Sequence, residues 1–110
     1  MNKTKFAIVV CVLLMLAACA NLSPADMLAD TYAGIEAAAL SADVASGQGY
    51  LSDDDKAKVK VTLQSAKDAA DQAMALLSLG NSPAALDKLQ IASGALYIVS
   101  EILERANASQ

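Results

Sequence analysis

The sequence predicts an all-α protein, a small three-helix bundle with helices at about residues 24–46, 53–79 and 83–106. Two observations carry this prediction. Apolar residues recur at the three- and four-residue spacing of an amphipathic helix, and each periodic segment is bounded by residues that start or stop helices. The loop between the second and third segments is only a few residues long, so these two helices should be antiparallel neighbours.

The first helix should begin at Ser23, which can cap it, and continue through Pro24, a residue favoured at the first helical position. It should end near Ser46, because Gly47 and Gly49 can adopt the positive φ that breaks a helix. The expected apolar stripe consists of Ala25, Leu28, Tyr32, Ile35, Ala39 and Ala42.

The second helix should begin after Ser52, which is followed by three carboxylates, at residues 53–55, in a first turn where the helix dipole favours negative charge. These carboxylates could be imagined as ligands of a hard cation, but adjacent residues at a helix start point in different directions, which favours capping. Gly80 is expected just beyond the end of the helix. The apolar stripe is Val59, Leu63, Ala66, Ala70, Ala73 and Leu77, and the opposite side carries Lys60, Gln64, Lys67, Asp68 and Asp71.

The third helix should start at the cap formed by Asn81 and Ser82, with Pro83 at its first position. Its stripe is Leu86, Leu89, Ala92, Leu96, Val99 and Leu103, and a second apolar set lies beside it: Ile91, Ala95, Ile98 and Ile102. So wide a face makes this helix either the centre of the bundle or a surface for a partner, and the second set is the possible partner face. The polar strip is Asp87, Gln90, Gly94, Tyr97, Glu101 and Glu104. We interpret Gly94 as a packing residue and the two glutamates as a solvated helix face rather than an acid–base pair.

The expected core is thin, because alanine occupies many of its positions and each alanine buries little apolar area. Alanine also allows helices to approach closely. A domain of this size without disulfides is expected to be only marginally stable alone, which favours self-association or docking to a protein partner.

The first residues of the chain have the organisation of an export signal. Lys3 and Lys5 form a basic start, and residues 6–16 are an uninterrupted apolar run. Because this run is shorter than the roughly 20 residues of a membrane-spanning helix, it favours a removable signal over a permanent span.

The run Leu16-Ala17-Ala18-Cys19 follows this signal and resembles the lipobox of bacterial lipoproteins. The resemblance implies cleavage between Ala18 and Cys19 by signal peptidase II, a diacylglycerol on the Cys19 thiol and a further acyl chain, such as palmitate, on its amino group. The chain would then divide into a signal peptide at 1–18, a lipidated tether at 19–23 and a helical domain at 24–110. In a Gram-negative host, Ala20 after the modified cysteine implies an anchor at the periplasmic face of the outer membrane.

Charge and composition exclude several classes of function. The sequence contains no histidine, which removes the usual nucleophilic systems and the commonest transition-metal ligand. All twelve acidic residues follow position 18, whereas two of the eight basic residues precede it, so the exported chain has a net charge of −6 and should not bind nucleic acid. We therefore expect a non-enzymatic protein without a small-molecule substrate, metal or cofactor other than its covalent lipid.

Beyond residue 19 the chain is loosely similar to small, alanine-rich helical lipoproteins of proteobacteria and their phages. The sequence leaves three hypotheses: an envelope interaction or structural protein with an unknown protein partner, a phage or lysis- and exclusion-type membrane-active lipoprotein, and an accessory factor of a hydrolase or carrier. The missing histidine makes the third the weakest.

Overall fold

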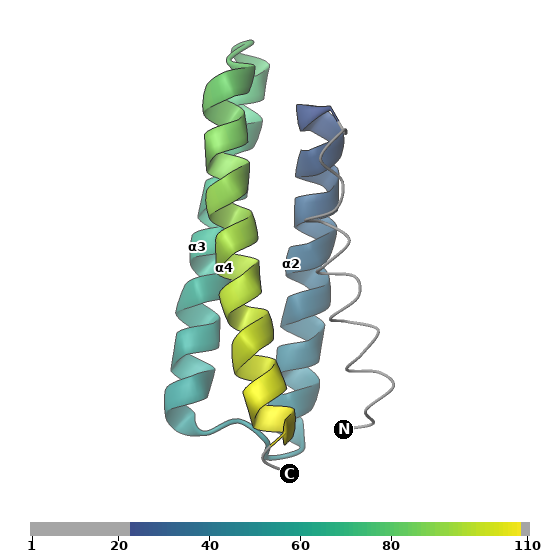
Figure 1. Cartoon of the computed structure of the whole chain (residues 1–110), viewed down its shortest axis with the longest axis vertical. Helices are drawn as coiled ribbons and strands as arrows, with labels where there is room; N and C mark the ends of the chain where they lie inside the picture. Colours follow the sequence, from purple (N-terminus) through teal and green to yellow (C-terminus); the bar gives the residue numbers. More distant parts are fainter. Residues whose placement is uncertain (1–22, 109–110) are drawn as a thin grey trace.

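The computed structural model describes residues 23–108, which form three α-helices and no β-strand within that range. The helices are α2 (Pro24–Gly47), α3 (Asp53–Ser78) and α4 (Ser82–Ala108), and each lies side by side with the other two (Figure 1). The bundle is elongated, with extents of 46 × 24 × 15 Å. The expected all-α three-helix bundle is confirmed, and the predicted helix bounds are within two residues of the observed ones.

Side-chain caps start all three helices. Ser23, Ser52 and Asn81 each accept a hydrogen bond from the backbone N–H three residues later, at 3.2, 3.1 and 3.3 Å. Such a cap satisfies a backbone donor that the helix itself cannot, and is worth about 1 kcal/mol. The three carboxylates that follow Ser52 therefore belong to a capped first turn, as expected.

Glycines with positive φ end α2 and α3. Gly49 has φ 77° and Gly80 has φ 76°, a conformation that other residues rarely adopt. After each glycine, the next backbone N–H donates to the carbonyl five residues earlier, Tyr50 to Ala45 and Asn81 to Leu76, both at 2.9 Å. This is the Schellman arrangement, and it turns the chain sharply between α3 and α4.

The core is centred on α4. The large side chains that are most fully buried are Leu89, Val99 and Leu103, all on this helix. This helix therefore supplies the largest part of the core, and the role of its wide apolar face as a surface for a partner stays a prediction. The rest of the core is mostly alanine, contributed by all three helices: Ala38, Ala42, Ala45, Ala66, Ala69, Ala70, Ala73, Ala85, Ala92, Ala95 and Ala106.

The stripe predicted for α3 packs as expected, with Val59, Ala66, Ala70 and Ala73 buried and two leucines half-buried. The stripe predicted for α2 is displaced. Its most buried residues lie mainly one position earlier along the chain: Thr31, Gly34, Ala38, Ser41, Ala42 and Ala45. Of the predicted stripe only Ala42 is buried, and Ala25 is exposed.

Small side chains explain the orientation of α2. Because this helix carries apolar residues on all sides, periodicity alone does not select a single face. Packing places its smallest residues inward, where they allow close approach of the backbones. The buried hydroxyls remain satisfied, since Thr31 and Ser41 donate to the carbonyls of Met27 and Ala37 at 2.7 and 3.0 Å.

Gly94 lies on the exposed side of α4, and a Cβ built at this position would have no atom within 4 Å. The interpretation of Gly94 as a packing residue is therefore wrong, because no neighbour requires its missing side chain.

We expect Gly94→Ala to stabilise the protein by about 0.5–1 kcal/mol, because alanine restricts the unfolded chain and favours the helix. Thermal unfolding followed by circular dichroism measures the effect as a higher Tm. An unchanged or lower Tm would mean that Gly94 has a neighbour in solution that the isolated chain does not contain.

Candidate interaction surfaces

The described helices hold no constellation that points to catalysis. Within residues 23–108, no group of three or more Cys, Asp or Glu side chains is arranged to hold a metal ion. No helix in the same range combines the length and apolar character needed to cross a bilayer. The predicted lipidation residue Cys19 and cleavage residue Ala18 lie outside the described residues.

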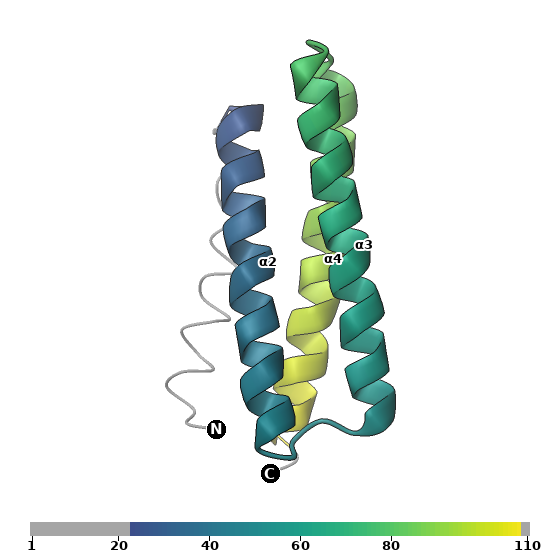
Figure 2. The ribbon, with the colours of Figure 1, turned by 180° about the vertical axis from the view of Figure 1, so that it is seen from behind.

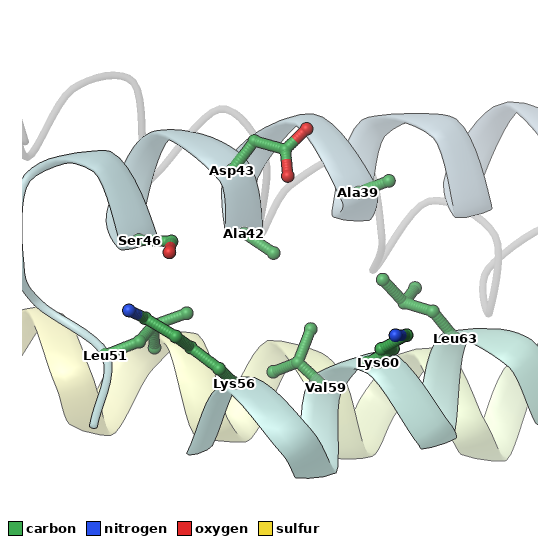
Figure 3. A pocket seen from close by; sticks show the side chains of 9 residues that line it. All are labelled: Ala39, Ala42, Asp43, Ser46, Leu51, Lys56, Val59, Lys60 and Leu63. Carbon is green, nitrogen blue, oxygen red and sulfur yellow. The ribbon is translucent and has the colours of Figure 1, made fainter. Parts of the chain in front are cut away.

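A groove of about 280 Å³ lies between α2 and α3, beside the loop that joins them (Figure 3). Ala39 and Ala42 of α2 face Val59 and Leu63 of α3 across it, and Leu51 of the loop lines one end. The groove exists because the α2 side chains here are too small to reach those of α3.

Polar side chains border this groove without entering its floor. Lys56 and Lys60 project from α3, and Lys56 extends toward Ser46 on α2 (Figure 3). The Asp43 carboxylate points away from the groove. Both lysines are exposed to solvent.

Tyr32 and Asp71 connect α2 to α3: the tyrosine hydroxyl donates a hydrogen bond to the carboxylate. Partial burial, together with this hydrogen bond and the negative charge of Asp71, raises the pKa of Tyr32 to about 12. The sequence placed Asp71 on the polar side of α3. The inter-helix hydrogen bond could not be predicted, because it joins residues 39 positions apart.

The raised pKa predicts how stability changes in alkali. In the unfolded chain the hydroxyl should ionise near 10, and in the folded protein near 12. The contribution of Tyr32 to stability is therefore fully present below pH 10 and is lost as the pH rises to 12. We expect ultraviolet titration to show a last tyrosine ionising near 12, and Tyr32→Phe to remove that step. A titration in which Tyr32→Phe leaves the last step in place would contradict the inter-helix bond.

The four residues of the possible partner face on α4 differ in their exposure to solvent. Ile91 and Ile98 are 55% and 49% exposed, whereas Ala95 and Ile102 are buried in the core. Ile91 and Ile98 lie two helical turns apart on the same side of α4. Tyr97 is also exposed, and the neighbouring Glu101 carboxylate raises the pKa of its hydroxyl. Only the exposed isoleucines can contact a partner without disturbing the bundle.

A second apolar surface runs along the outer side of α2, and the sequence reasoning missed it. We call it the outer stripe. It consists of Ala29, Ala33, Ala37, Leu40 and Val44, spaced three or four residues apart. Leu40 is 66% exposed and Val44 44% exposed, and the two alanines nearest the helix start are also exposed. The signal was present in the sequence: α2 has apolar residues on all sides, as a helix buried on more than one face does.

Comparison of the chain with protein-family models, curated proteins and solved structures gave no match. The class that the structure defines is a small all-α three-helix bundle with exposed apolar helix surfaces.

Proposed function

We propose that this protein is a lipid-anchored, non-enzymatic component of a bacterial envelope that binds another envelope protein through α2. The observation that carries this proposal is the outer stripe, an apolar helix face with Leu40 66% exposed and Val44 44% exposed. A helix that is apolar on two faces is ordinarily covered on both. In the bundle, α3 and α4 cover only one of them.

Charge indicates what kind of partner fits. α2 contains four carboxylates, at Asp26, Asp30, Glu36 and Asp43, and no basic residue. A partner that presents an apolar surface bordered by lysine or arginine would complement these charges. A second copy of α2 would instead bring carboxylates together, which disfavours self-association through this face.

The anchor is proposed from the lipobox resemblance at residues 16–19. One acyl chain gives only marginal membrane binding, whereas two or three together hold a protein stably. Confinement at a membrane surface raises the effective concentration of a partner in the same envelope. A helix face of small area can therefore be sufficient for binding.

Site-specific photo-crosslinking in intact cells tests the partner. The crosslinking residue is placed at Leu40 on the outer stripe or, as a control, at Val61 on α3, and both positions are 66% exposed. We expect a discrete crosslinked protein from position 40 and none from position 61. The crosslink should weaken when Glu36→Lys reverses one of the bordering charges.

Three results would count against this interface. Equal crosslinking from both positions, or none from position 40, would remove the outer stripe as the binding face. A crosslinked dimer of the protein itself would overturn the charge argument. An undiminished crosslink in Glu36→Lys would mean that the partner is not recognised by complementary charge.

A second candidate, a phage or lysis- and exclusion-type membrane-active lipoprotein, is favoured by one observation. Leu79, between α3 and α4, is 80% exposed, as a lipid-contacting side chain would be. Release of a trapped dye from lipid vesicles by the purified lipoprotein would support this candidate. Intact vesicles would favour the interaction role.

A further inference from the structure

The turn between α3 and α4, with the helix ends that it joins, forms a surface without charge. We call residues 72–86 the tip. Over these fifteen positions the sequence has no Asp, Glu, Lys or Arg, although such residues make up 18% of the whole chain. Their absence removes the main energetic barrier to contact with an apolar phase.

Large apolar side chains are exposed on the tip. Leu79 is 80% exposed and Met74 49% exposed, and three further leucines are half-buried: Leu76, Leu77 and Leu86. Leu79 is the C-cap of α3, immediately before the positive-φ glycine of the turn. The Schellman hydrogen bonds fix this turn and therefore hold Leu79 outward on a rigid support.

The tip lies at the end of the bundle from which the chain leads toward Cys19. Figures 1 and 2 both place the start of α2 at this end and show the α3–α4 turn reaching beyond it. Cys19 precedes Ser23, the cap of α2, by only a few residues. At about 3.3–3.6 Å per extended residue, this connection spans less than ~20 Å.

The two ends of the bundle differ sharply in charge. The end opposite the tip is rich in charge of both signs: the three carboxylates at 53–55 are followed by Lys56 and Lys58, and Glu101 and Glu104 near the end of α4 are followed by Arg105. Near the tip, Asp26 in the first turn of α2 is exposed and accepts a hydrogen bond from the Ser23 hydroxyl at 2.9 Å. Because the turn reaches beyond the start of α2, the tip can touch an apolar surface while Asp26 stays in water.

We propose that the tip contacts the bilayer that holds the Cys19 lipid, with the Leu79 side chain inserted at the membrane interface. This contact rests on the proposed anchor. It would orient the bundle with its long axis away from the membrane and its charged end outward. It would also leave the outer stripe, on the side of the bundle, accessible to a protein partner.

Fluorescence of a label on the tip tests the contact in the full lipoprotein. After cleavage and lipidation the chain would have no free thiol, so Leu79→Cys would provide a single labelling site. Val61→Cys is the matched control, because Val61 is 66% exposed on the outer side of α3. Each protein is labelled with an environment-sensitive dye and reconstituted in phosphatidylethanolamine–phosphatidylglycerol vesicles, with or without brominated acyl chains.

We expect the emission of the label at position 79 to shift to the blue on vesicles, and its intensity to fall by more than half when the lipid is brominated. The label at position 61 should keep its emission wavelength and its intensity under both conditions. Equal behaviour of the two labels on a protein whose mass includes the lipid would overturn the tip contact and leave the anchor intact. A protein whose Cys19 carries no lipid would overturn the anchor and the contact that rests on it.

Discussion

Replacing Leu103 with alanine is expected to lower the free energy of unfolding by about 3 kcal/mol. Leu103 is 2% exposed and lies in the C-terminal part of α4, where it packs in the same cluster as Val99 and Leu96. Most other core positions are alanine, so few side chains are able to fill the cavity that the substitution leaves. Urea denaturation followed by circular dichroism measures the change.

Ile91→Ala is the control for this prediction, since it removes a large apolar side chain from the same helix at a position that is 55% exposed. It should change the free energy of unfolding by about 0.5 kcal/mol or less. If the two variants lost the same free energy of unfolding, the result would contradict the structure, in which Leu103 is on the buried side of α4 and Ile91 on the exposed side.

The second large effect concerns the small residues of the core. Ala66 on α3 has an exposed fraction of 0% and lies in the main core cluster. We expect Ala66→Leu to destabilise the protein by about 1–3 kcal/mol, because a well-packed core has no room for the added methyl groups without moving a helix. The same denaturation experiment measures it.

Ala75→Leu provides the matched control, because Ala75 lies on the exposed side of α3 and leucine has nearly the same helix propensity as alanine. It should leave stability almost unchanged. If Ala66→Leu left stability as unchanged as Ala75→Leu does, or raised it, the result would contradict the close packing of the helices through their alanines.

The sequence was sufficient to predict which sides of α3 and α4 are buried, because each helix contrasts a charged side with an apolar one. Lys60, Lys67 and Asp68 on α3 are exposed as expected, and so are Glu101 and Glu104 on α4. On α2 the contrast is weak. Alanines surround the helix, and the choice of its inner face depends on which residues fit against the other two helices.

The candidate surfaces could be predicted only in part. Ile91 and Ile98 are exposed as a partner face requires, but Ile102, four residues after Ile98, is buried in the core. The outer stripe was missed because α2 has apolar residues on several sides, and the periodicity did not separate Leu40 and Val44 from the inward side. The α2–α3 groove depends on the distance between two helices, which cannot be predicted from a local sequence pattern.

The central claim is that Cys19 anchors the bundle to a membrane, and the intact mass of the protein extracted from membranes tests it most directly. We predict a chain that begins at Cys19 and carries the added mass of a diacylglycerol and an acyl group, and an uncleaved precursor when signal peptidase II is inhibited with globomycin. A membrane-bound chain that retains Met1 without the inhibitor, or one in which Cys19 is unmodified, would contradict the claim.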